Sequence, residues 1–311
     1  MHRGVVGLRL GWDVFRSRIW IGGMAGFVLL AASEVGIAAQ PRASATPVAA
    51  TPAAAAGGNG FSVYFLRPFN SGANISPFDV VAAAQRDAAP PPGEEPGALA
   101  TAALSALVAG PNAIEREAGL TTKLPPDQAF TAVTVADGVA TVTAPAAFFA
   151  GETDAELPPR LAQVVFTLTA IPAIDEVLFL GEGGEPPAAS AGIDLTAALG
   201  RDDFAAQTPP ILIESPAAGA TVTNPVRVRG TANTVEGSFQ LQVEQTVDGQ
   251  VVILGATGVQ TAGSGTRGAF DVVIELPAGA SGPARLVSFQ VARNIEGDPI
   301  DRAEVPIVLR P

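Results

Sequence analysis

Residues 133–143 read VTVADGVATVT, two alternating runs joined by Asp137-Gly138. An Asp-Gly pair between such runs is the strongest short-range signal of a β-hairpin, because both residues tolerate the positive φ of a two-residue turn. The sequence therefore predicts two antiparallel strands here. The segments on either side indicate what surrounds them.

Helical patterns flank this hairpin. Apolar residues recur at helical spacing between Leu99 and Val108, and again between Leu161 and Ile171, where Pro172 ends the pattern. Short strands are predicted at Phe61–Phe65 and Val177–Leu180. Strands interleaved with helices predict an α+β domain with a small sheet and two main amphipathic helices.

Four segments of this half together resemble the GerMN domain of sporulation and germination proteins. They are AALSALVAGP (102–111), EAGLTTKLP (117–125), the hairpin VTVADGVATVT (133–143) and LAQVVFTLTAIP (161–172). The resemblance covers roughly Phe61 to Phe204, and departs from the family pattern in the loops at 143–145 and 181–184. The GerMN fold resembles ring-building domains of specialised secretion systems, so the resemblance implies self-association or docking into an envelope complex.

From Pro210 onward the pattern changes to short strands separated by turn signals. The predicted strands are 211–213, 226–228, 239–243, 251–254, 270–274, 286–291 and 305–309. Phe239, Leu241 and Val243 alternate with polar residues, which predicts a strand with one solvated face. About seven such strands predict an all-β sandwich of immunoglobulin type.

This second half also resembles a known domain. The segments IESP (213–216), GATVTNPVRVRG (219–230), 232–239 and GAFDVV (268–273) are similar to the immunoglobulin-like domain of bacterial spore germination. That domain often follows a GerMN domain, so the order of the two halves supports both resemblances. We therefore expect a GerMN-like domain at 61–205 and an immunoglobulin-like sandwich at 206–311.

The N-terminal segment has the features of an export signal. Four arginines crowd residues 1–18, and residues 19–32 form an unbroken apolar run. This asymmetry predicts a cytoplasmic basic segment at 1–18, followed at 19–39 by either a cleaved signal peptide or a retained signal-anchor helix. Residues 40–60 are rich in Ala, Pro, Thr and Gly, which predicts a disordered, flexible linker.

Composition excludes several classes of site. His2 is the only histidine and cysteine is absent, so the body of the chain holds neither a Ser-His-Asp or Cys-His site nor a zinc site of the usual ligands. The net charge of −12 disfavours nucleic acid as a partner. After Trp20, Tyr64 is the only Trp or Tyr, which weighs against stacking on sugars.

Carboxylates are the remaining candidates for acid–base or calcium chemistry. The local groups are Glu115 with Glu117, Asp175-Glu176, Asp202-Asp203, and Asp298 with Asp301. Their polar or turn-like contexts predict solvated surface groups, and Lys123, in a Pro-rich loop, is interpreted as a surface lysine. No catalytic, cofactor-binding or metal-ligating residue is assigned.

The leading hypothesis is a non-catalytic, exported protein of the cell envelope. Its expected partners are envelope proteins or a second copy, and the cytoplasmic membrane if the N-terminal helix is uncleaved. An exposed strand edge on the sandwich is one expected means of docking. The alternatives are a module that binds peptidoglycan or another glycan and, last, a carboxylate-dependent cell-wall hydrolase.

Overall fold

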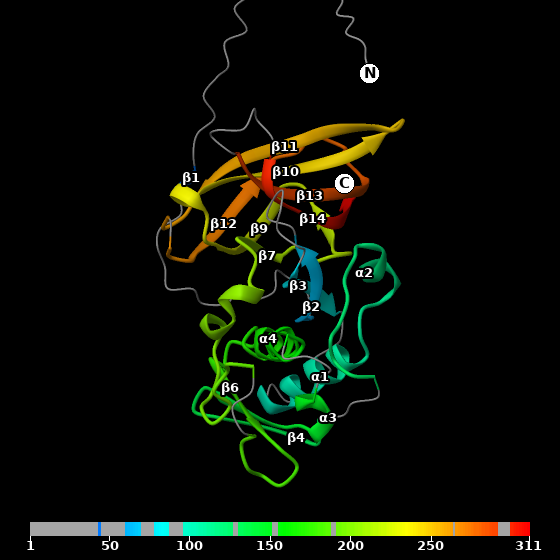
Figure 1. Cartoon of the computed structure of the whole chain (residues 1–311). Helices are drawn as coiled ribbons and strands as arrows, with labels where there is room; N and C mark the ends of the chain where they lie inside the picture. Colours follow the sequence, from blue (N-terminus) through cyan, green and yellow to red (C-terminus); the bar gives the residue numbers. More distant parts are fainter. Residues whose placement is uncertain are drawn as a thin grey trace, which may run out of the picture. The chain divides into compact units, whose positions relative to one another are not determined.

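The computed structural model describes residues 43–44, 60–69, 78–86, 96–126, 130–150, 155–187, 191–263, 265–291 and 299–311. Residues 40–311 belong to one compact unit (Figure 1). The predicted basic segment, the signal or anchor helix and all but three residues of the predicted linker (43, 44 and 60) lie outside the described residues. Among the helices that are described, none is long and apolar enough to cross a membrane.

The first half is a mixed α/β domain whose strands form two separate sheets. Strands β2 (Phe61–Phe69) and β3 (Phe78–Arg86) pair antiparallel. Strands β4 (Ala132–Ala136), β5 (Val139–Thr143) and β6 (Glu176–Leu180) form the other sheet, in the order β4-β5-β6. The expectation of one small sheet is therefore wrong, because β2 and β3 pair only with each other within the named strands.

The Asp-Gly hairpin is confirmed. Asp137 and Gly138 have φ of 51° and 82°, and β4 pairs antiparallel with β5 in a regular register. Strand β6 then adds in parallel to β5, which requires a crossover connection. That crossover holds the short helix α3 (Ala146–Phe149) and the long helix α4 (Leu157–Leu168).

Helix α4 is the centre of this domain. It contacts β2, β3, β6 and α1 (Pro96–Val108), so it is covered on every side (Figure 1). Every residue of α4 except Pro158 is buried, including Arg160, Gln163 and Thr167. The prediction of an amphipathic helix is therefore wrong at this position: a helix with no solvated face is a core helix.

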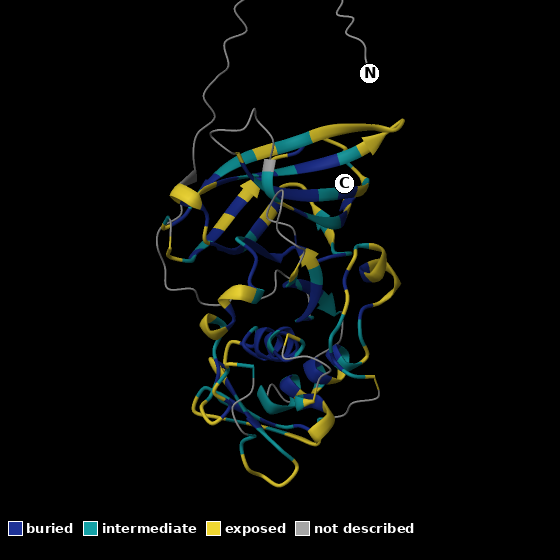
Figure 2. Ribbon diagram, in the orientation of Figure 1, coloured by how far each residue is buried: buried dark blue, intermediate teal, exposed yellow. Residues whose placement is uncertain are grey.

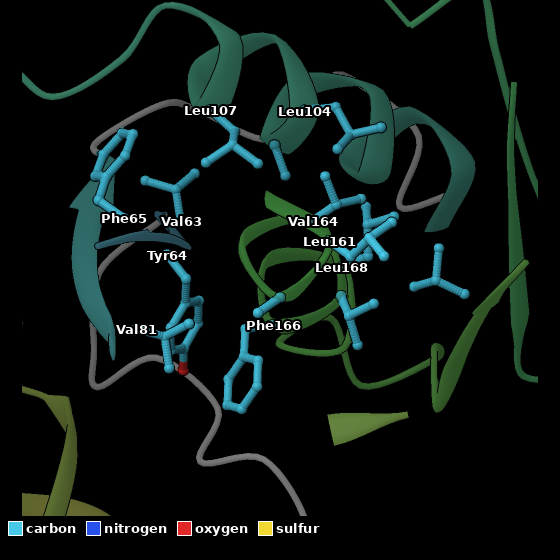
Figure 3. Packing of buried hydrophobic residues seen from close by; sticks show 14 of the residues in the cluster. Val63, Tyr64, Phe65, Val81, Leu104, Leu107, Leu161, Val164, Phe166 and Leu168 are labelled. Atoms are coloured by element: carbon cyan, nitrogen blue, oxygen red, sulfur yellow. The ribbon is translucent and has the colours of Figure 1, made fainter. Parts of the chain in front are cut away.

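Aromatic and branched side chains fill the space between β2 and the two long helices (Figure 3). Tyr64 and Phe166 pack with ring centroids 5.5 Å apart, and Leu104 and Leu107 of α1 turn toward Val164 of α4 (Figure 3). Leu212, Ala217 and Ala218 of the second half belong to the same hydrophobic cluster. The core of the mixed domain therefore continues into the first residues of the β-rich region. The short helix α2 (Ala113–Glu117) follows α1.

The second half is an all-β region of two sheets around one hydrophobic core. One sheet has the order β12-β9-β7, with β7 at Ile211–Ser215, β9 at Val226–Ala232 and β12 at Gly268–Ile274. The other has the order β1-β11-β10-β13-β14-β8. Its strands are β1 (Ala43–Ser44), β8 (Thr221–Thr223), β10 (Ser238–Val247), β11 (Gln250–Gln260), β13 (Gly282–Val291) and β14 (Pro299–Arg310). The short 3-10 helix η1 (Arg201–Gln207) precedes β7, and η2 (Val235–Gly237) precedes β10.

Candidate interaction surface

The hairpin of β10 and β11 extends beyond the sheet to which it belongs. Asp248 and Gly249, with φ of 50° and 77°, form its turn. Strand β13 pairs with β10 only from Gln240 to Glu244, whereas β10 and β11 stay paired to the turn (Figure 1). The end of the hairpin, residues 245–253, is therefore a two-stranded ribbon, which we call the arm.

The arm exposes branched apolar side chains on both faces. Val251 and Ile253 are each 56% exposed and point to one face, because side chains alternate along a strand. Val252, 41% exposed, points to the opposite face with its cross-strand neighbour Gln245. The end of the hairpin is exposed in Figure 2 as well. Exposed apolar residues gathered in this way indicate an interaction site rather than ordinary surface.

Strand β11 also has a free edge. On its outer side it pairs with β1 alone, at Val259 and Gln260; in the described part of the chain, no strand pairs with residues 250–258 on that side. Strand β11 reads QVVILGATGVQ and carries no charged residue and no proline. Natural edge strands usually carry such residues to prevent unwanted pairing, so this edge is open to an added strand.

A buried carboxylate fixes the base of the arm. Glu244 is only 4% exposed in its side chain and accepts hydrogen bonds from Arg285 at 3.1 Å and Arg302 at 3.2 Å. Both arginines also pair with Glu304 at 3.0 Å. The network compensates the charge of Glu244, so the sheet beside the arm is held by ion pairs, while strand β11 of the arm carries no charge.

A second polar cluster joins the two halves of the chain. The Tyr64 hydroxyl donates to Glu214 Oε1 at 2.9 Å, and Arg201 Nη1 donates to the same oxygen at 2.5 Å. Arg201 also donates to Thr169 Oγ1 at 2.7 Å and lies over the ring of Phe166, 4.8 Å from its centroid. Burial, followed by the charge of Glu214, raises the pKa of Tyr64 far above its ordinary value, so Tyr64 stays a neutral donor.

A cleft of about 840 Å³ lies beside this cluster. Its walls include Arg201 and Arg267, the carboxylates of 175–176 and 202–203, and the threonines 169, 208 and 231. Arg267 donates to Pro209 O at 2.8 Å, and burial lowers its pKa to about 10, which leaves it charged at neutral pH. Thr169 Oγ1 and Thr208 Oγ1 donate to main-chain carbonyls, and Thr231 Oγ1 accepts from Arg267.

The carboxylates expected to be solvated surface groups differ in their burial. The expectation of a solvated surface group is wrong for Glu115, which is buried because it pairs with Arg86 and accepts from the Asn112 amide at the start of α2, whereas Glu117 is exposed. The pairs at 175–176 and 202–203 are exposed on the rim of the cleft. Asp298 lies outside the described residues, and Asp301 is partly buried against Gln290, with its pKa raised by burial. Within the described ranges, no three His, Cys, Asp or Glu side chains are placed to hold a metal ion.

Lys123 is half-exposed and pairs with Asp79 at 3.6 Å, in agreement with an ordinary surface lysine. Its main chain is held more firmly than its side chain. The Lys123 amide donates to Gln163 Oε1 at 2.9 Å, and its carbonyl accepts from Arg160 Nε at 2.9 Å. These contacts come from buried polar residues of α4, so the loop is a structural support.

Sequence reasoning missed Glu214 and Glu244. Glu214 stands in the buried strand ILIES, where an acidic residue among apolar ones is a signal that it has a partner. Glu244 lies on the same face as Gln242, which donates to it, but Arg285 and Arg302 cover that face at this point, so a residue expected to be solvated is buried. The partners of both residues come from distant parts of the chain, which no local pattern reveals.

Comparisons with known proteins agree with the two halves of the fold. The family model for sporulation and spore germination matches residues 62–186, and the model for the immunoglobulin-like domain of bacterial spore germination matches residues 210–294. No curated protein matches the chain in sequence.

Two solved structures are similar to part of the chain. One, described as a lipoprotein of Clostridium perfringens, is 18% identical over 48% of this chain and 91% of its own, with a TM-score of 0.31. The other holds the tandem GerMN domains of the sporulation protein GerM from Bacillus subtilis; it is 22% identical over 46% of this chain and 44% of its own, with a TM-score of 0.31. The chain thus spans less than half of that second protein.

Residues 62–186 are therefore a GerMN-like domain of the sporulation and spore germination family, followed at 210–294 by an immunoglobulin-like domain of bacterial spore germination.

Proposed function

We propose that this chain is a non-catalytic, exported protein of the cell envelope that binds other proteins through the free edge of β11. The observation that carries the proposal is the arm: an uncharged strand edge with Val251, Val252 and Ile253 exposed beside it. Strand addition supplies affinity through main-chain hydrogen bonds and specificity through alternate side chains. The edge of β11 offers both main-chain groups without a paired strand at 250–258, in the described part of the chain, and exposed alternate side chains.

A non-catalytic role is supported by the chemistry of the described residues. The buried carboxylates Glu115, Glu214 and Glu244 are each paired with arginine. General acid catalysis needs a carboxylate that keeps its proton near neutral pH, opposite a second carboxylate across a cleft. The carboxylates that line the cleft, at 175–176 and 202–203, are exposed rather than buried.

The glycan-binding alternative has less support. Tyr64 is the only Trp or Tyr in the described part of the chain, and it is 1% exposed and bound to Glu214. It therefore cannot stack on a sugar. Binding of peptidoglycan would have to rely on polar contacts alone.

Location outside the cytoplasm is supported by the arginine-rich start followed by the apolar run at 19–32, and by the germination families of both domains. If the apolar run is uncleaved, it attaches the protein to the cytoplasmic membrane. A fusion of alkaline phosphatase to the C-terminus tests this, because that reporter is active only where its disulfides form. Activity supports export, and an inactive fusion present at equal amount contradicts it.

The docking role is tested by placing a photo-crosslinking amino acid at Ile253 of the full-length chain in living cells. Val308 on β14, 39% exposed, is the matched control position. We expect discrete crosslinked protein species from position 253 that are absent from position 308. Equal crosslinking from both positions, or none from 253, would contradict docking at the arm.

A further inference from the structure

The arm has no paired strand on the β13 side, where Gln245 Nε2 donates to Ser281 O at 2.8 Å and to Pro283 O at 3.2 Å. Val243 and Leu241 of β10 lie in the sandwich core, but beyond Glu244 the ribbon has no sheet neighbour on the β13 side. A two-stranded ribbon alone is marginally stable in water, and three or more strands with a covered face are needed for independent stability. A strand added along β11 would supply that third strand.

The edge already accepts an added strand. Strand β1 pairs in parallel with β11, Ala43 with Val259 and Ser44 with Gln260. Strand β1 lies far from β11 in sequence, so the pairing is a long-range addition rather than a hairpin. The same edge continues without interruption by charge from Val259 back to Gln250, toward the arm.

The distribution of charge on the chain favours contact between two copies at the edge of β11 over contact elsewhere. The chain has a net charge of −12, so two copies repel each other over most of their surface. Strand β11 has no charge of its own, and the nearby Glu244 is compensated by Arg285 and Arg302. By contrast, edge strand β12 carries the exposed ion pair of Asp271 with Arg227. The arm is therefore a place where two copies can meet without like charges opposite each other.

The order of side chains in the arm is self-complementary. If two β11 strands pair antiparallel about a two-fold axis at Val252, Val252 faces its own copy and Val251 faces Ile253 of the second copy. Each face of the new sheet then gains apolar cross-strand pairs, which stabilise a sheet by roughly 0.2–1 kcal/mol each. Asp248, the nearest acidic residue in the turn, falls opposite Ala256, so no like charges meet.

We propose that two copies of this chain pair through their arms, with β11 antiparallel to β11 about Val252, in an isologous dimer. The proposal rests on the proposed function, since it names the partner that occupies the docking edge. The pairing uses residues around 250–254 and leaves the β1 contact at Val259 and Gln260 in place.

The absence of cysteine makes a disulfide test clean. In the full-length chain, Val252→Cys introduces the only thiol, and Val273→Cys on β12 is the matched control, because Val252 and Val273 are 41% and 48% exposed. Directly opposed residues in antiparallel strands have Cα atoms about 4.5–5.5 Å apart, within the range that a disulfide spans. Under mild oxidation in cells, we expect a covalent homodimer from Val252→Cys and none above background from Val273→Cys.

A second experiment tests the register of the two β11 strands. Two differently tagged copies, one with Val251→Cys and the other with Ile253→Cys, are expected to form a mixed disulfide more efficiently than Val251→Cys forms one with itself. A mixed disulfide no more frequent than the self-pairing would overturn the register about Val252.

The outcomes separate the dimer from docking in general. If Val252→Cys bonds to a different protein, the arm docks a partner strand and the dimer is overturned while the proposed function stands. If Val252→Cys stays monomeric and captures nothing, both are overturned.

To guard against misfolding of the thiol variant, Val252→Arg and Val273→Arg are compared by sedimentation velocity, with circular dichroism as the folding control. Val252→Arg is expected to raise the dimer dissociation constant at least about tenfold and Val273→Arg to leave it unchanged; equal constants would contradict the dimer.

Discussion

Tyr64 and Glu214 stand 150 positions apart in the sequence, yet the Tyr64 hydroxyl donates a hydrogen bond of 2.9 Å to Glu214 Oε1. Arg201 donates to the same oxygen, so one carboxylate receives a donor from the GerMN-like domain and another from the segment that connects the domains. Leu212 and Ala218 extend the hydrophobic core across the same junction. The two domains are thereby joined by packing and by the polar cluster of Tyr64, Arg201 and Glu214, which we call the lock.

The lock is tested by Glu214→Gln. The substitution keeps the shape of the side chain but leaves the largely buried Arg201 without a counter-charge, so we expect a loss of about 3 kcal/mol in the free energy of unfolding. Urea denaturation of the full chain measures it. The matched control is Asp271→Asn, which breaks the exposed pair with Arg227 and should cost less than about 1 kcal/mol. Equal losses in the free energy of unfolding from the two variants would contradict a stabilising role of the lock.

Arg160 holds the loops around α4 from within the core. Its guanidinium donates to the carbonyls of Lys123, Phe148 and Ala150 and is 4% exposed. Arg160→Lys keeps the charge but cannot reach three carbonyls in a fixed fork. We expect a loss of about 1–3 kcal/mol per orphaned carbonyl, hence partial unfolding at 37 °C. The control Arg227→Lys, on the exposed face of β9, should leave the midpoint of thermal unfolding within a few degrees, and a comparable loss in both variants would contradict this role.

Gly230 lies where β9 passes close to β7. A Cβ at this position would be 2.0 Å from Leu212 O and 2.9 Å from the ring of Phe270. Gly230→Ala should therefore cost at least about 1–3 kcal/mol, since main chain must move to admit the methyl group. Gly181→Ala, whose Cβ would meet only Glu185 O at 3.6 Å, is the control and should be near neutral by the same denaturation measurement. A stable Gly230→Ala protein would show that the two strands are farther apart than described.

The pH dependence of stability should carry a contribution from Asp301. Burial raises the pKa of Asp301, which accepts a hydrogen bond from Gln290. The folded state therefore binds a proton more tightly than the unfolded state, so this residue lowers the stability as the pH rises from the unfolded pKa, about 4, through the folded value. Asparagine also tolerates the positive φ of 53° at this position and does not titrate. The Asp301→Asn variant should therefore lose less stability between pH 4 and pH 7 than the wild type does. An unchanged pH profile in that variant would contradict the assignment.

The comparison of sequence and structure separates local signals from long-range ones. The turn at Asp137-Gly138 is encoded by two adjacent residues, and it is confirmed. Strand β3, FDVVAAAQR, was not predicted, because its three alanines have little preference for strands and it forms only by pairing with β2. Helix α4 was predicted as amphipathic from the spacing of the apolar residues between Leu161 and Ile171, whereas its polar residues Arg160 and Gln163 are also buried and donate to main-chain carbonyls of other elements.

The same distinction applies to the interaction surface. A free edge on the sandwich was expected from its many strands, but its location depends on where β13 stops pairing with β10, after Glu244. The amino-acid sequence shows that residues 250–260 carry no charge, but only the strand order shows that β11 lies at the edge of its sheet. The buried ions Glu214 and Glu244 likewise depend on arginines from other strands or helices.

Thiol accessibility in living cells measures whether the arm is covered by a partner. Full-length Val252→Cys and Val273→Cys are labelled with a maleimide under reducing conditions, in intact cells and again after dilution of the purified protein. The two positions are similarly exposed in the single chain, at 41% and 48%, so their labelling rates should be similar when the protein is dilute. We expect Val252→Cys to label at least about tenfold more slowly than Val273→Cys in cells, a tenfold ratio corresponding to about 1.4 kcal/mol of protection. Equal rates in cells would mean that nothing covers the arm, and would contradict the account.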